Sequence, residues 1–178
     1  MIVVVGPSRG GKTTLLEGVL ADFPNLILLD LDAEENHAVA AIRACGGDPD
    51  GWEARWQRNC DAIARAEASS GANNIIVDVG AGSLQTPEGR AFFRSHCGSA
   101  IAVVAPFEVV PARHGSRDPE EFRRTEYSPE RQAVYSAARY QIDSSLPIED
   151  SLRKFRVALY DMLSGRAHLS GTADTISR

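Results

Sequence analysis

Short apolar runs alternate along this chain with segments whose apolar residues recur at helical spacing. The apolar runs predict five buried strands, at residues 1–5, 26–31, 75–77, 100–105 and 140–142. The helical spacing predicts helices at residues 13–22, 33–45, 52–69, 87–96, 129–138 and 147–163. Buried strands that alternate with helices are typical of βαβ units, in which helices cover both faces of a parallel sheet. The pattern therefore predicts a three-layer α/β fold with a five-stranded parallel sheet flanked by helices.

The first apolar run leads directly into Gly6-Pro7-Ser8-Arg9-Gly10-Gly11-Lys12-Thr13, which matches G-x-x-x-x-G-K-[ST] between a strand and a helix. This is the P-loop motif, and a chance Gly-rich turn is disfavoured because every fixed position and both flanks agree. The glycines let the backbone turn its N–H groups toward phosphates, and the following helix N-terminus attracts the same charge. Lys12 would contact the β- and γ-phosphates, and Thr13 would bind Mg²⁺. The expected nucleotide-binding residues are Gly6, Gly10, Gly11, Lys12, Thr13 and Thr14.

Carboxylates follow the second predicted strand, in the sequence Leu29-Asp30-Leu31-Asp32. Ligands of parallel α/β sheets bind at the carboxyl ends of the strands. Residues i and i+2 of a strand share a face, so Asp30 and Asp32 are expected to point the same way. We interpret one as a Mg²⁺ ligand through water and the other as the partner of an acceptor hydroxyl. Capping of the next helix is the alternative role for these residues.

The third predicted strand ends at Asp78, followed by Gly80-Ala81-Gly82. Apolar residues that end in Asp resemble the pattern of a second magnesium-orienting carboxylate. Asp30 and Asp78 are both candidates for this role, and the sequence does not separate them. Gly80 and Gly82 would let an acceptor approach the backbone, although an ordinary turn would use the same residues.

An arginine-rich stretch follows the fourth strand and suggests a lid at about residues 112–127. A guanidinium carried by a closing lid can stabilise the charge that develops in phosphoryl transfer. Acidic residues interrupt the stretch, so most of these charges are expected to lie on the surface, and one or two arginines are expected to act in the site. The arginines are Arg113, Arg117, Arg123, Arg124 and Arg131.

Composition narrows the class of protein further. Asp and Glu total 24 against 19 Lys and Arg, a formal charge of −5, which argues against binding to nucleic acid or a membrane surface. Three scattered cysteines suit a reducing cytoplasm and no zinc site. No apolar run approaches the roughly 20 residues of a membrane span. We expect one domain at residues 1–164 with a flexible tail at 165–178, active in the cytoplasm as a monomer or weak homodimer.

These motifs resemble shikimate kinases, in order and spacing, from Met1 to about Leu163. The P-loop is the specific match, and Leu29-Asp30-Leu31-Asp32 resembles the family's D-x-D. The resemblance implies a kinase that uses ATP and Mg²⁺ to phosphorylate a hydroxyl of a small anionic cyclic polyol. It implies Asp30 as a metal ligand beside Thr13, and Asp32 as the residue that binds the acceptor hydroxyl. Asp78 stays a candidate metal ligand from the strand pattern alone.

Further segments carry the resemblance to the acceptor site. Arg58-Asn59-Cys60-Asp61 resembles the F-R-x-x-E segment, which implies that Arg58 binds the carboxylate of the acceptor. Glu130-Arg131-Gln132-Ala133-Val134-Tyr135 resembles E-R-x-P-L-Y, which implies that Arg131 is the second carboxylate ligand. Gly80-Ala81-Gly82 lies where the family has three glycines that line the acceptor site. The resemblance also implies that Arg113 lies near the adenine and that Arg117 is the catalytic lid residue beside Lys12 and Asp32.

The sequence departs from the family pattern around the acceptor. Ala81 replaces the middle glycine, Asp78 replaces a small neutral residue, and Gln57 stands where the family has Phe. A kinase retargeted to another alcohol, such as a sugar acid, an antibiotic or a secondary-metabolite cyclitol, is therefore an open alternative. A second alternative is a nucleotide-dependent switch without a small acceptor. A nucleoside monophosphate kinase is disfavoured because its arginine pattern is absent.

Overall fold

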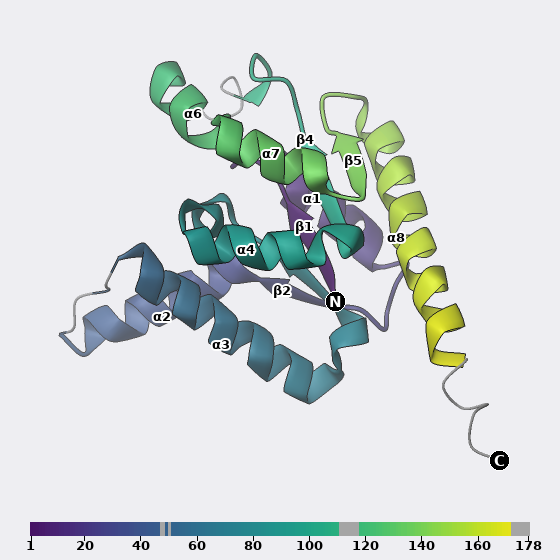
Figure 1. The fold of residues 1–178 in the computed structure, drawn as a ribbon, viewed down its shortest axis with the longest axis horizontal. Helices are drawn as coiled ribbons and strands as arrows, with labels where there is room; N and C mark the ends of the chain where they lie inside the picture. Colours follow the sequence, from purple (N-terminus) through teal and green to yellow (C-terminus); the bar gives the residue numbers. More distant parts are fainter. Residues whose placement is uncertain (47–48, 50, 111–117, 172–178) are drawn as a thin grey trace.

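A five-stranded parallel sheet forms the centre of the molecule, with strand order β2-β3-β1-β4-β5 (Figure 1). The computed structural model describes residues 1–46, 49, 51–110 and 118–171, with side chains as far as residue 165. The strands are β1 (Ile2–Val5), β2 (Ile27–Asp30), β3 (Ile75–Asp78), β4 (Ala100–Val104) and β5 (Tyr140–Asp143). All paired strands are parallel, so their carboxyl ends lie along one edge of the sheet.

Helices cover both faces of the sheet (Figure 1). They are α1 (Lys12–Leu20), α2 (Leu31–Ala44), α3 (Trp52–Ser70), α4 (Pro87–His96), α6 (Pro119–Glu126), α7 (Pro129–Ala137) and α8 (Ile148–Gly171). Short 3₁₀ turns are η1 (Ala72–Asn74), η2 (Ala81–Gln85) and η3 (Cys97–Ser99). The three-layer α/β architecture predicted from the apolar pattern is confirmed.

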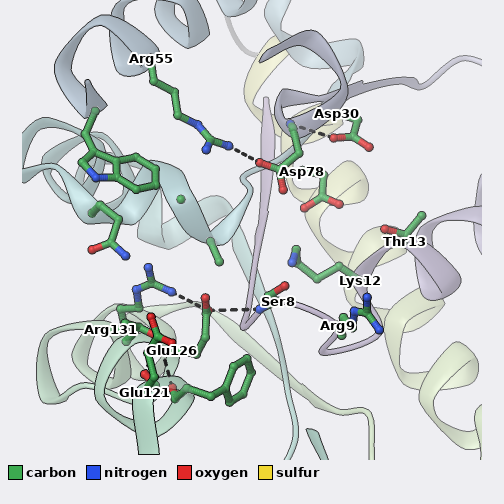
Figure 2. A pocket seen from close by; sticks show the side chains of 17 residues that line it. Ser8, Arg9, Lys12, Thr13, Asp30, Arg55, Asp78, Glu121, Glu126 and Arg131 are labelled. Carbon is green, nitrogen blue, oxygen red and sulfur yellow. Dashed lines mark hydrogen bonds and ion pairs between the residues drawn. The ribbon is translucent and has the colours of Figure 1, made fainter. Parts of the chain in front are cut away.

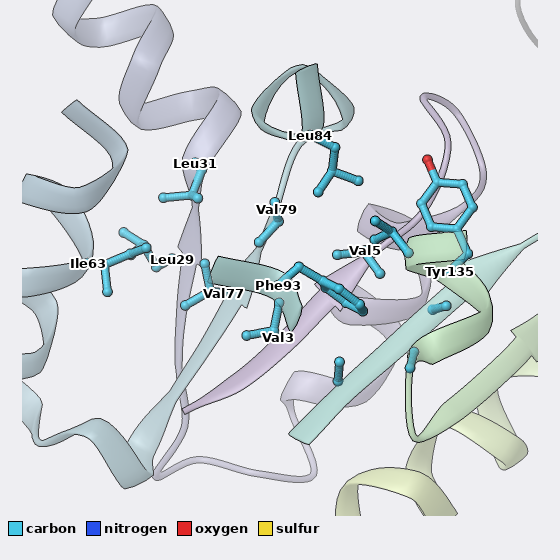
Figure 3. Packing of buried hydrophobic residues seen from close by; sticks show 14 of the residues in the cluster. Val3, Val5, Leu29, Leu31, Ile63, Val77, Val79, Leu84, Phe93 and Tyr135 are labelled. Atoms are coloured by element: carbon cyan, nitrogen blue, oxygen red, sulfur yellow. The ribbon is translucent and has the colours of Figure 1, made fainter. Parts of the chain in front are cut away.

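Alternation along β1 divides the core into two layers. Val3 and Val5 point into the cluster beneath α3, α4 and α7, where Phe93 is fully buried (Figure 3). Ile2 and Val4 point to the opposite face, where α1 and α8 pack. Both faces of the strand are buried, which explains why its sequence is continuously apolar.

Two segments differ most from the sequence-based prediction. The arginine-rich segment expected to form a lid contains helix α6, which Asp118 caps by accepting a hydrogen bond from Glu120 N–H at 3.0 Å. The expected tail from residue 165 begins inside α8, which continues to Gly171. No helix in the part of the chain that the structure describes has the length and apolarity needed to cross a membrane.

Candidate active site

A cavity of about 610 Å³ opens at the carboxyl ends of the strands (Figure 2). Its P-loop side consists of the loop after β1 and the ends of β2 and β3, with residues Ser8, Arg9, Lys12, Thr13, Asp30 and Asp78. Its helix side consists of residues from α2, α3, η2, α6 and α7, namely Asp32, Trp52, Arg55, Ala81, Gly82, Gln85, Glu121, Phe122, Thr125, Glu126 and Arg131. The cavity thus joins the predicted phosphate site to residues from distant parts of the sequence.

The P-loop has the backbone that its motif requires. Gly11 precedes α1 with φ 92°, a conformation that L side chains rarely adopt. Gly6 and Gly10 lie in the same loop, and Arg9 also has a positive φ of 56°. A non-glycine residue in this region signals a backbone shaped for function. The loop therefore has the form expected of a phosphate cradle.

Lys12 begins α1 and is buried, with 8% of its surface exposed. Its Nζ donates to the carbonyl oxygens of Gly6 and Pro7 at 3.3 and 3.4 Å. The ammonium is therefore held over the loop, where phosphate oxygens can take the place of these two long hydrogen bonds. Thr13 is exposed and lines the cavity.

A second cavity, of about 250 Å³, lies beside the P-loop and is lined by Thr14 together with Arg9, Gly11, Leu15, Ser144, Leu146, Ile148 and Ser151. Thr14 therefore belongs to this neighbouring space rather than to the main cavity. The residues from the β5–α8 connection carry no motif, so they could not be expected here from the sequence. Arg113 and Arg117 lie outside the described residues, so their predicted roles near the adenine and in the lid stay predictions.

Asp30 and Asp32 both line the main cavity, but not for the reason predicted. Strand β2 ends at Asp30 and α2 begins at Leu31, so the alternation of a strand does not relate the two carboxylates. Asp30 caps α2 by accepting hydrogen bonds from Asp32 N–H at 2.9 Å and Ala33 N–H at 3.0 Å. The capping role is thus present, and the cap also places Asp32 in the first helical turn, at the cavity.

Asp32 forms an ion pair with Arg55, with 2.5 Å between Oδ1 and Nη2. The pair depends on Gly80, because a Cβ at this position would lie 2.0 Å from Asp32 Oδ1. Gly80 therefore gives the carboxylate room rather than contacting the cavity itself. Ala81 and Gly82 lie on the cavity wall as predicted.

Asp78 is the most unusual carboxylate of the cavity. It ends β3 beside Asp30 of β2, is only 5% exposed, and its Oδ1 has no hydrogen-bond partner. Burial raises the pKa of Asp78 to about 6, while nearby Lys12 lowers it and the carboxylates of Asp30 and Asp32 raise it. An unpartnered buried oxygen beside the P-loop suits a cation that arrives with the nucleotide.

The donors present are suitable for Mg²⁺ bound together with phosphates. Magnesium is commonly held by one or two carboxylates plus phosphate oxygens and waters, rather than by a complete protein cage. No group of three His, Cys, Asp or Glu side chains within the described ranges could hold a metal ion alone. Thr13, Asp30 and Asp78 would supply the hydroxyl and the carboxylates. The ion would neutralise charge on the transferring phosphoryl group.

Arg58 does not line this cavity, so the structure does not bring it together with the other residues predicted to bind the acceptor. Its Nε and Nη2 donate to the two carboxylate oxygens of Glu35 at 2.9 and 2.6 Å. This pair joins α3 to α2 in a separate groove. Arg55 lies one helical turn closer to the start of α3 and lines the main cavity instead, together with Trp52. Helix α3 precedes β3 in the chain, so its first turns, with Trp52 and Arg55, lie at the carboxyl ends of the strands. The order of the predicted elements could have indicated this.

Arg131 lines the cavity as predicted but is already paired. Glu126, the last residue of α6, accepts hydrogen bonds from Arg131 Nη1 at 2.5 Å and from Ser8 N–H at 3.2 Å (Figure 2). Both side chains of the pair are buried. Glu126 is one of the acidic residues that interrupt the predicted lid, where most charges were expected on the surface, and it connects the P-loop to α7 instead.

The fold is shared with solved structures of P-loop kinases. The Aquifex aeolicus shikimate kinase has 20% identity over 90% of this chain and 96% of its own, with a TM-score of 0.62. The Acinetobacter baumannii shikimate kinase in complex with shikimate has 19% identity over 98% and 94%, with a TM-score of 0.58. A sugar kinase from Janibacter sp. HTCC2649 has 23% identity over 89% and 92%, with a TM-score of 0.55. No protein-family model and no curated protein matches the sequence. The chain therefore has the fold of shikimate kinases and related P-loop kinases.

Proposed function

We propose that this protein transfers the γ-phosphoryl group of MgATP to a hydroxyl of a small polyol. The observation that carries the proposal is the main cavity, in which the P-loop side faces the helix side across about 610 Å³ of space. Solved kinases of the same fold include shikimate and sugar kinases, which supports a small-molecule acceptor. A nucleotide switch without an acceptor would need no such space opposite its phosphate site.

The roles follow from position and chemistry. Lys12 neutralises the transferring phosphoryl group, and Thr13, Asp30 and Asp78 hold Mg²⁺. Asp32 orients the acceptor hydroxyl, and Arg55 holds the carboxylate of Asp32 in place. Phosphoryl transfer depends chiefly on positioning and on stabilisation of charge, so no strong base is required. The nucleoside would occupy the neighbouring space beside Thr14, with Arg113 near the adenine and Arg117 closing over the phosphates.

Shikimate, or a similar cyclic acid, is the acceptor implied by the resemblance. Two observations favour the retargeted alternative: Arg58 lies in another groove, and Arg131 is paired with Glu126. ADP release from MgATP should rise and saturate with the true acceptor. Release that no polyol or polyol acid increases, with binding of a protein partner, would contradict the proposal and favour the switch.

Arg55→Ala and Arg58→Ala form a matched pair of variants on α3. We expect Arg55→Ala to raise the acceptor KM at least about tenfold, because a charge-assisted contact that holds Asp32 is lost. The KM for ATP should change little. Steady-state kinetics with varied acceptor and fixed saturating ATP would measure both.

Arg58→Ala should instead leave the acceptor KM unchanged and reduce stability by about 1–3 kcal/mol, because Glu35 loses its bidentate partner. Thermal and denaturant unfolding would measure this loss. A large rise in the acceptor KM of Arg58→Ala, with no change in Arg55→Ala, would reverse the two assignments.

A further inference from the structure

We propose that the acceptor is a polyol without an acidic group, and that Glu126 is the residue that selects against acids. The inference rests on the proposed function, because it assigns a substrate class to the helix side of the same cavity. It differs from the carboxylated acceptor that the sequence resemblance implies.

Among the described residues, both guanidinium groups of the helix side are paired with carboxylates of this chain. Arg55 pairs with Asp32, and Arg131 pairs with Glu126, each at 2.5 Å. The second pair is buried on both sides, with 3% and 7% of the side chains exposed. An incoming carboxylate would compete with Glu126 for the Arg131 guanidinium, and displacement of Glu126 would leave a buried charge without its partner, which is costly.

The charge balance of the described lining points the same way. The helix side holds three carboxylates, of Asp32, Glu121 and Glu126, against the guanidinium groups of Arg55 and Arg131. On the P-loop side, Asp30 and Asp78 are balanced by Lys12 and Arg9, so the excess of negative charge lies on the helix side, and MgATP would bring more. An acidic acceptor would therefore enter a region of like charge, whereas hydroxyl groups can donate to these carboxylates and accept from the arginines.

Trp52 gives the helix side an apolar surface of the kind that the carbon–hydrogen face of a sugar or cyclitol can cover. Its side chain lines the cavity and is 47% exposed. Arg55 lies over its ring, 5.4 Å from the ring centroid. Gly82 allows this arrangement, because a Cβ there would lie 2.7 Å from Arg55 Nη1 and 3.0 Å from the Trp52 ring. An exposed aromatic face beside paired polar groups suits an uncharged polyhydroxylated ring.

Matched acceptors test the inference directly. The two members of each pair differ at one carbon, which carries an ester or hydroxymethyl group in the uncharged member and a carboxylate in the acid: methyl shikimate and shikimate, glucose and glucuronate, glucitol and gluconate. Binding to the full chain is followed by tryptophan fluorescence with MgADP present, so no turnover is needed. We expect the uncharged member to bind at least about tenfold more tightly in the pair that fits best. Tighter binding of the acid, or no response to any uncharged member, overturns the inference.

Two variants on α6 separate selection by Glu126 from a general charge effect. Glu126→Gln removes the negative charge that pairs with Arg131 and is expected to improve binding of the acid at least about tenfold. Glu121→Gln removes one negative charge from the same wall without touching Arg131, and should change binding of the acid by less than about threefold. Equal effects of the two variants would remove the selective role of Glu126.

The binding preference and the proposed reaction can fail independently. Preferential binding of uncharged polyols without any phosphoryl transfer would support the uncharged polyol as the ligand of this cavity and remove the kinase proposal. Phosphoryl transfer to an acid, with the uncharged partner inactive, would keep the kinase proposal and overturn the acceptor class.

Discussion

Lys12→Ala is expected to lose at least about a hundredfold in the rate of phosphoryl transfer, the scale of removing one preorganised donor to developing charge. Its ammonium is buried at the start of α1 and directed over the P-loop by hydrogen bonds to the carbonyl oxygens of Gly6 and Pro7. No described side chain other than Arg9 adds a positive charge to the P-loop side of the cavity. Single-turnover rates with saturating MgATP and acceptor would separate this effect from weaker nucleotide binding.

Lys154→Ala is the natural control, because Lys154 is the other lysine of the chain and is exposed on α8. It should retain the rate of the natural sequence. A Lys12→Ala variant that turns over at the rate of Lys154→Ala would remove the P-loop from the mechanism.

Asp78→Asn is expected to stabilise the nucleotide-free protein near neutral pH. The pKa of Asp78 is raised from 3.8 in the ordinary carboxyl to about 6, chiefly by burial. A group with a raised folded-state pKa contributes stability that is complete below the ordinary value and is lost as pH rises through about 6. Above that pH the ionised carboxylate costs up to roughly 3 kcal/mol, a penalty that the amide avoids.

Denaturant unfolding in EDTA between pH 4 and pH 8, at roughly unit steps in pH, would measure the stability difference between Asp78→Asn and the natural sequence. The free energy of unfolding of Asp78→Asn should exceed that of the natural sequence by an amount that grows from pH 4 to about pH 7 and then stays constant. Asp61→Asn, an exposed carboxylate on α3, serves as the control and should show no such difference. A difference of the same size in both variants would contradict the account of Asp78. With MgATP present, Asp78→Asn should lose its gain in the free energy of unfolding, because Mg²⁺ would then lack the Asp78 carboxylate as a ligand.

The elements of the fold could be predicted because their signals are local. Helix α4 begins and ends as expected, since Thr86 caps it by accepting from Gly89 N–H at 3.0 Å and proline occupies its first position. The P-loop could be predicted equally well, because one continuous segment contains both its glycines and its lysine. The prediction that Asp30 and Asp32 share one face of a strand was wrong for a local reason as well. Asp30 ends β2 and caps α2, which begins at the next residue.

The helix side of the cavity was harder to predict because it is assembled from distant segments. Arg55 and Arg58 are three residues apart on one helix, and only the tertiary arrangement shows that the first faces the cavity and the second faces Glu35. Glu126 lies in a run of mixed charges that reads as a solvated surface. Its burial follows from the position of α6 against the P-loop, a contact across 118 residues of sequence.

The central claim is that this chain phosphorylates a small polyol, and the transfer of label from γ-labelled ATP tests it most directly. The full chain is incubated with MgATP and the matched polyols and acids, and the products are separated into phosphate esters, inorganic phosphate and labelled protein. The account predicts an acceptor-dependent phosphate ester, abolished in Lys12→Ala. Label found only in inorganic phosphate or on the protein, at a rate that no acceptor changes, would contradict it.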